Sequence, residues 1–149
     1  MSRYSMTTTK AGVNTANTIM WAIKAGAAQR VQLLELGLSV EVAPTTGPAW
    51  RLNRPTAVGV SSATVAPQPE DPDVAAATAA LETTWTTAPT LAAVDLRRFA
   101  TPNSIGSGIV WTWYDSPLVI PKGGSIAVVN GNASGTTLGT LSMYALVAE

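Results

Sequence analysis

Carboxylates hold most of the catalytic potential of this sequence, because its 149 residues include neither histidine nor cysteine. Without histidine, the commonest general base, the usual partner of a nucleophilic serine and the commonest zinc ligand are all missing. The nine acidic residues would support only an enzyme of the paired-carboxylate type. The neighbouring sequence identifies no two of these acids as a catalytic pair. The sequence therefore predicts a protein that is not an enzyme and uses no cofactor, with a carboxylate-based glycan hydrolase as the least favoured alternative.

The densest group of acids lies in a proline-rich segment, "SSATVAPQPEDPD" at 61–73. A calcium loop needs oxygen ligands at alternate positions and a glycine at its sharp turn. That spacing is missing around Glu70, Asp71 and Asp73. We therefore expect a solvated loop here and no metal site.

Charged residues make up only 12% of the chain, and the net charge is zero. Nucleic-acid binding needs a concentrated positive face, whereas the cationic pairs Arg51 with Arg54 and Arg97 with Arg98 are short. The apolar run "IMWAI" at 19–23 is too short to span a membrane. We expect neither a nucleic-acid nor a membrane partner. So few charges favour a surface covered by copies of the chain or by another protein.

An aromatic segment, "GIVWTWYDSPLVIPKGGSIAVVN" at 108–130, offers two interpretations. In an extended strand Ile109, Trp111 and Trp113 share one face, and Tyr114 belongs to the other. Exposed tryptophans could stack on sugar rings, whereas buried ones would fill a core between two sheets. We favour the core, with "PKGG" as an exposed turn.

The elements that would position these side chains are strands. Alternation of apolar and polar residues is clearest in "LLELGLSVEV" at 33–42. One face of that strand is predicted to hold Leu34, Leu36, Leu38, Val40 and Val42. The same pattern predicts strands in "TIMWAIKA" at 18–25, with Ile19, Trp21 and Ile23 on one face, in 90–102, with Ala92, Val94 and Leu96 together, and in the last ten residues.

Glycine and proline separate these short strands, which is typical of an all-β sandwich or barrel. The alanine-rich segment "DVAAATAALETTW" at 73–85 is ambiguous, because Asp71 and Pro72 could start a short helix while the later threonines favour an extended chain. Both conformations stay open for residues 73–82.

The first 17 residues contain few apolar side chains, and we expect them to form an N-terminal arm or edge strand. The domain itself is predicted to span residues 18–149 and to fold without that arm. Ordering of the arm would require a partner, with Arg3, Tyr4, Met6 and Lys10 as the expected partner contacts.

The order of elements resembles that of the capsid decoration, or cement, proteins of tailed bacteriophages, whose jelly-roll β-sandwich is similar to the tumour-necrosis-factor fold. The resemblance covers most of residues 18–149 and consists of patterns of residue type and order. It rests on the stretches "VQLLELGLSVEV", "RPTAVG", "DPDVAAATAALETTWTTAPT", "GIVWTW", "LVIPKGGSIAVVN" and "MYALVAE".

The resemblance implies a homotrimeric jelly roll that is made in the host cytoplasm, binds the major capsid protein lattice on the outer surface of the virion and stabilises the head. The alternative is a receptor-binding or tail-fibre-tip jelly-roll module, possibly one that binds a glycan. Neither role requires a catalytic, metal or cofactor site, in agreement with the composition.

Overall fold

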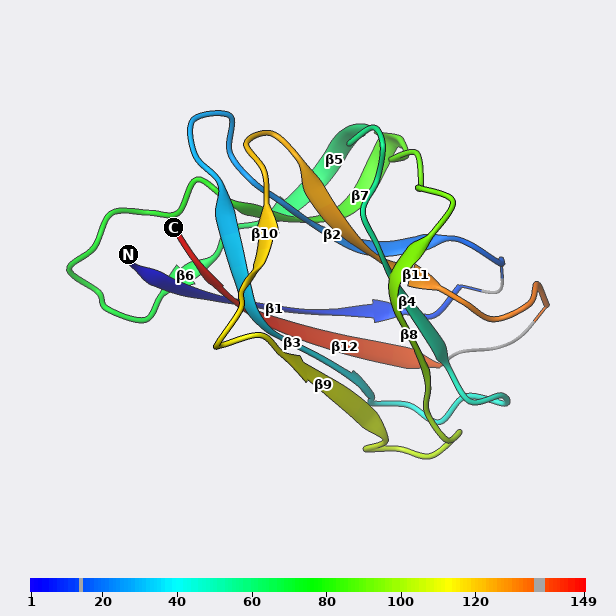
Figure 1. Cartoon of the computed structure of the whole chain (residues 1–149). Helices are drawn as coiled ribbons and strands as arrows, with labels where there is room; N and C mark the ends of the chain where they lie inside the picture. Colours follow the sequence, from blue (N-terminus) through cyan, green and yellow to red (C-terminus); the bar gives the residue numbers. More distant parts are fainter. Residues whose placement is uncertain (14, 136–138) are drawn as a thin grey trace.

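Two antiparallel β-sheets pack face to face in the computed structural model of the chain (Figure 1). The structure describes residues 1–13, 15–135 and 139–149. Asn14 of the expected arm and residues 136–138 of the glycine-rich segment before the last strand lie outside the described residues. The prediction of an all-β sandwich is confirmed. No helix in the described part of the chain could cross a membrane.

Each sheet has six strands in the part of the chain that the structure describes. Sheet A consists of β1 (Arg3–Ala11), β3 (Val31–Val40), β6 (Gln68–Pro69), β9 (Gly108–Thr112), β10 (Leu118–Ile120) and β12 (Thr140–Ala148). Sheet B consists of β2 (Ile19–Lys24), β4 (Ala49–Asn53), β5 (Val60–Val65), β7 (Ala80–Thr87), β8 (Asp95–Ala100) and β11 (Ser125–Asn130). Sheet A has the order β10-β3-β12-β1-β6, with β9 also paired to β3, and sheet B has the order β5-β7-β2-β11-β4-β8.

The core lies between the two sheets, and its centre is a stacked pair of tryptophans. The ring centroids of Trp21 on β2 and Trp50 on β4 are 6.4 Å apart. Both side chains are fully buried, and neither indole N–H has an acceptor among the described residues. This pair therefore stabilises the sandwich through packing of its large apolar surfaces.

Two β-bulges change the faces predicted from simple alternation. The pairing of β11 with β2 skips Met20, so Ile19 packs in a small cluster apart from the core that contains Trp21. The pairing of β12 with β3 skips Leu34, which brings Leu33 into the core. An inserted residue reverses the side-chain alternation on one side of it, which explains why Ile19 and Trp21 do not share a face.

Strand ends account for two further differences from the predicted faces. β3 ends at Val40, so Val42 is 54% exposed. β8 begins only at Asp95, and Val94, predicted to share an inward face with Ala92 and Leu96, is 79% exposed. Residues 73–79 form a loop and β7 starts at Ala80, so the short helix is wrong and the extended conformation is found only from Ala80 onward.

The aromatic segment faces the core as predicted but is only half-buried. Ile109, Trp111 and Trp113 pack against the core from β9 and the residue that follows it. The two indole centroids are 6.5 Å apart at a tilt of 46°. Among the described residues β9 pairs on one side only, with β3, so these rings stay half-buried at the margin of the core, whereas Trp21 and Trp50 are fully buried in it.

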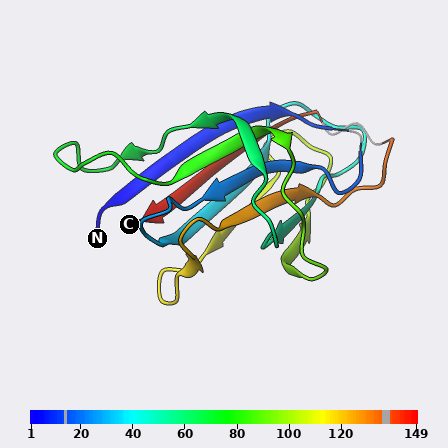
Figure 2. The ribbon, with the colours of Figure 1, turned by 90° about the horizontal axis from the view of Figure 1, so that it is seen from above.

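The structure does not show a separate N-terminal arm, because residues 3–11 form β1. All nine residues of β1 pair with β12, and Tyr4 and Ser5 also pair with β6. The two chain ends therefore lie side by side (Figures 1 and 2), where the backbone groups of Ser2 and Glu149 bond to each other. From Met6 onward β1 pairs with β12 alone, as an edge strand would.

We expect β1 to be needed for folding. Met6 is 2% exposed in the core, and truncating a buried methionine costs about 2–5 kcal/mol. The matched control is Thr7→Ala, which changes the exposed neighbour on the opposite face of the same strand and should shift stability by only about 0.5 kcal/mol. Urea unfolding of Met6→Ala and Thr7→Ala measures both. Equal stability of the two variants would contradict the placement of β1.

Candidate functional site

A groove of about 590 Å³ lies on the outer face of sheet A, away from the core. Residues of β1, β3, β9 and β12 line it, so its floor crosses four strands. Such a volume is within the range of roughly 300–1,000 Å³ that is typical of small-molecule sites. The groove lies where the sequence predicted only an outward-facing polar surface.

The wall of the groove depends on one cross-strand pair. Tyr144 of β12 lies opposite Gly37 of β3, and a Cβ atom added to Gly37 would stand 1.9 Å from a carbon of the Tyr144 ring. The ring therefore lies across the glycine backbone, in space that any larger residue would occupy. A glycine inside a strand weakens the strand but permits such a close approach.

Glu35 fixes the other end of the Tyr144 side chain. The Tyr144 hydroxyl donates to Oε1 of Glu35 at 2.5 Å, and the Tyr114 hydroxyl donates to Oε2 at 2.9 Å. The hydrogen bond to Glu35 and, to a lesser extent, burial raise the pKa of Tyr144 to about 12. The hydrogen bond between Tyr114 and Glu35 likewise raises the pKa of Tyr114. At neutral pH both phenols keep their protons, so this cluster orients a ring and does not supply a tyrosinate nucleophile.

Hydroxyl groups, together with apolar residues such as Ile109 and Val110 of β9, line the remainder of the groove. Ser39 and Ser142 share a hydrogen bond of 2.6 Å between their hydroxyls. Thr7 and Thr9 project from the outward face of β1. Their hydroxyls have no protein partner in the described part of the chain, so they are available to a ligand.

Of the four residues predicted to contact a partner, only Arg3 is exposed. Tyr4 and Met6 lie in the core, and the Tyr4 hydroxyl donates to the carbonyl of Ala75 at 2.8 Å. The Lys10 ammonium group donates to the carbonyl oxygens of Met20 and Thr83 at 3.0 and 2.6 Å. Burial lowers the pKa of Lys10.

The side chains of Tyr4, Met6 and Lys10 thus make contacts within their own chain. Lys10 bonds across the sandwich, from β1 of sheet A to β2 and β7 of sheet B. The structure brings none of these three side chains to the groove.

A buried carboxylate lies on β7, next in sequence to Thr83, whose carbonyl oxygen accepts the bond from Lys10. Glu82 is 1% exposed, and its carboxylate is 3.3 Å from the ammonium group of Lys24. It also accepts a hydrogen bond of 3.0 Å from the indole of Trp85, whose ring lies 5.5 Å from the Lys10 ammonium. Because a buried charge is costly unless it is paired, this arrangement is a structural ion pair.

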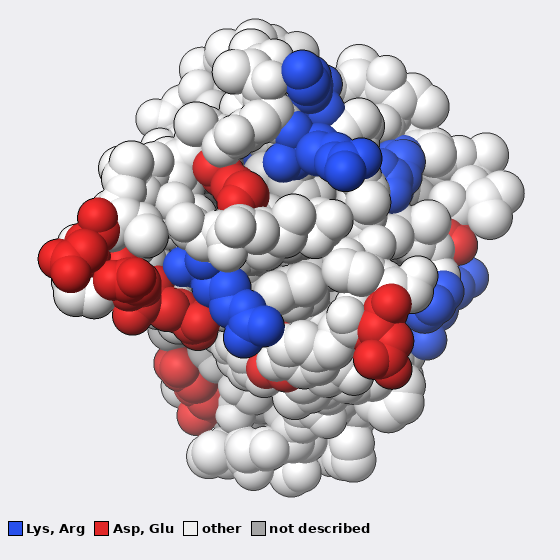
Figure 3. Space-filling view, turned by 60° about the vertical axis from the view of Figure 1, so that its left-hand side comes forward, with Lys and Arg blue, Asp and Glu red and all other residues white. Residues whose placement is uncertain are grey.

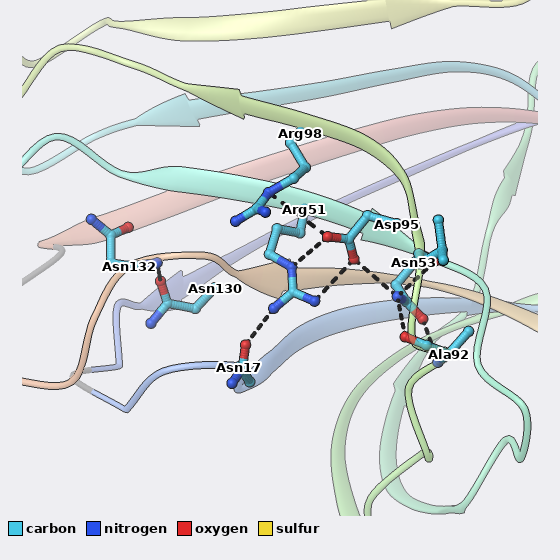
Figure 4. A network of polar contacts seen from close by, with 9 residues as sticks. Asn17, Arg51, Asn53, Ala92, Asp95, Arg98, Asn130 and Asn132 are labelled. Atoms are coloured by element: carbon cyan, nitrogen blue, oxygen red, sulfur yellow. Dashed lines mark hydrogen bonds and ion pairs between the residues drawn. The ribbon is translucent and has the colours of Figure 1, made fainter.

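A second polar network links β4, β8 and the loop before β2 (Figure 4). Arg51 donates two hydrogen bonds to Asp95, at 2.8 and 3.0 Å, and a third to the side chain of Asn17. Asn53 donates to Asp95 at 2.9 Å. The hydrogen bond from Arg51 is the main reason that the pKa of Asp95 is lowered.

These contacts define what the carboxylates do in this structure. Glu35, Glu82 and Asp95 are held by tyrosine, lysine and arginine side chains respectively. Over the described residues 1–13, 15–135 and 139–149, no group of three or more acidic side chains could hold a metal ion. The groove is therefore suited to non-covalent binding through a fixed ring and free hydroxyls.

Sequence reasoning missed Gly37, Tyr144 and Glu35 as parts of one site. Alternation predicts that Glu35 and Gly37 face outward on one strand and that Tyr144 faces outward on another. The pairing register that places Tyr144 on Gly37 depends on contacts more than 100 positions apart in the chain. The available signal was a glycine inside an otherwise regular strand, which often marks a close approach.

The chain matches no protein-family model, no curated protein sequence and no solved structure.

We expect Glu35 to control the titration of Tyr144. A phenol whose pKa is about 12 when folded and about 10 when unfolded stabilises the fold below pH 10 and loses that contribution as the pH rises from 10 to 12. Glu35→Ala should return the Tyr144 titration towards pH 10. Ultraviolet absorbance of tyrosinate measures it, with Tyr144→Phe identifying the Tyr144 signal among the three tyrosines. Identical curves with and without Glu35 would contradict the hydrogen-bonded cluster.

Proposed function

We propose that this protein is a structural virion protein that forms a homotrimer, binds the outer surface of a phage capsid and stabilises the head. The observation that carries this proposal is an edge with exposed apolar side chains, formed by β8 and the residue before it, by β9 and by the segment between the two strands. Four large apolar side chains are exposed there: Val94 at 79%, Phe99 at 45%, Ile105 at 68% and Val110 at 52%.

The β8–β9 edge has unused backbone groups as well as apolar side chains. β8 pairs only with β4, and β9 pairs only with β3, in the part of the chain that the structure describes. An exposed apolar edge strand is a site of association unless charges or proline protect it. β9 has neither, since its sequence is "GIVWT", whereas β8, "DLRRFA", carries charges of both signs. A second copy of the chain on this edge would pair the free backbone groups and cover the apolar side chains.

The strand order supports a jelly roll as the finer description of the sandwich. If β9 and β10 are counted as one interrupted strand, the main strands in chain order are β1, β2, β3, β4, β8, β9, β11 and β12. Numbered one to eight, they give the orders 1-8-3-6 and 2-7-4-5 in the two sheets. A double-sheet jelly roll of eight strands has this alternating course, and capsid domains use that architecture.

The surface charge is in keeping with a protein that is covered in its working state. On the face drawn in Figure 3, positive groups gather near the top and negative groups at the left edge, with wide uncharged areas between these clusters. Interfaces between subunits are depleted of charge at their centres, whereas a small soluble monomer needs charge to stay dispersed. The trimeric state and the capsid partner come from the resemblance to decoration proteins.

We expect the β8–β9 edge to hold the trimer together. Replacing both Val94 and Ile105 with aspartate would bury charges in the interface, so the variant should elute as a monomer of 15.4 kDa while the wild type has three times that mass. The matched control is Val60→Asp, which changes a valine that is 57% exposed on the opposite edge strand of sheet B. Light scattering coupled to gel filtration measures the masses. A monomeric wild-type protein would refute the trimer.

We expect the wild-type protein to co-sediment with undecorated phage capsids and to raise their melting temperature. The aspartate double variant should bind much more weakly, because a monomer loses the avidity of three linked sites. Binding to host cell envelopes without binding to capsids would favour the fibre-tip alternative, in which the same fold binds a receptor on the host surface.

A further inference from the structure

We propose that the groove on the outer face of sheet A is a binding site for a neutral oligosaccharide, with the ring of Tyr144 as the surface on which one sugar ring stacks. This function goes beyond trimer formation and capsid binding, and the groove adjoins the β8–β9 edge at Val110. It rests on the position of the ring, on the free hydroxyls around it and on the charge of the groove.

The Tyr144 ring is fixed before any ligand arrives. The ring packs on the backbone of Gly37, and a hydrogen bond of 2.5 Å to Glu35 fixes the Tyr144 hydroxyl. The residue remains 36% exposed and borders the groove. A sugar ring presents a face of C–H groups that packs well against an aromatic ring, and a pre-positioned ring loses little conformational entropy on binding.

Hydrogen-bonding groups lie around this ring at positions that a sugar could use. The hydroxyls of Thr7 and Thr9 are free and exposed on β1, and the carboxylate of Glu41 lies at the margin of the groove. A carboxylate accepts strong hydrogen bonds from sugar hydroxyls, and a threonine can both donate and accept. A ring combined with short hydroxyl side chains is also the composition of adaptable binding surfaces in other proteins.

The charge of the groove selects among sugars. Neither lysine nor arginine is among the described residues that line it, whereas Glu41 contributes a negative charge. A sialylated, sulfated or phosphorylated ligand would therefore meet repulsion without a compensating cation. The floor of the groove crosses four strands, which leaves room for a short chain of neutral sugars.

The test begins with a glycan array that carries neutral hexose and N-acetylhexosamine oligosaccharides beside sialylated and sulfated ones. We expect binding to neutral glycans only. The best-bound neutral glycan is then titrated calorimetrically into the wild type and into Tyr144→Ala, for which we expect affinity to fall about tenfold or more. Tyr114→Ala is the matched control, because Tyr114 also bonds to Glu35 but does not line the groove.

A second variant keeps the test decisive if Tyr144→Ala fails to fold. Thr7→Val combined with Thr9→Val removes two exposed hydroxyls and keeps β-branched side chains on β1, so folding should be retained while affinity falls several-fold. No binding of any neutral glycan at millimolar concentration would overturn the proposal. So would preferential binding of charged glycans, or unchanged affinity in the threonine variant. If the array shows no glycan binding and Tyr144→Ala dissociates the trimer, the groove is an interface between copies of the chain and the proposal is wrong.

Discussion

Pairing of the last strand, β12, between β1 and β3 is the constraint on which the rest of the structure depends. Nine residue pairs join β12 to β1, and eight join it to β3. The hydrogen bonds of these ladders fix which residues of β12 face inward. Met143 and Ala145 then enter the core, and Tyr144 between them must project from the outer face. One register therefore determines both the packing of the sandwich and the wall of the groove.

The same register explains how a glycine is tolerated within a central strand. Gly37 has no side chain to contribute to either face, which weakens β3. The ring of Tyr144 covers the vacant position and gains a fixed orientation from it, which Glu35 completes. The contact between the Tyr144 ring and Gly37 thus both covers the weak point of the strand and fixes the ring that borders the groove. Replacing Gly37 with any larger residue would displace the ring, so the two properties cannot be separated by mutation at that position.

Local patterns in the sequence predicted the class of fold and several faces but not the long-range pairing. Alternation correctly placed Leu36, Leu38 and Val40 in the core. It misplaced Ile19, because a bulge at Met20 adds one residue to β2, and nothing in the local pattern marks that insertion. Tyr4 and Met6 were assigned to partner contacts because their segment is rich in threonine. In the structure the polar residues of β1 alternate with these two, and β12 supplies the pairing that the segment alone could not.

Native-state hydrogen exchange tests the central claim most directly, since it reports the free energy at which each backbone amide opens. If β1 is an integral strand of sheet A, its amides bonded to β12 should exchange as slowly as those of β12 bonded to β3, through global unfolding. Rapid exchange along residues 3–11 beside slow exchange in β3 would show that the N-terminal segment is a mobile arm, and would contradict the account of the core and of the groove.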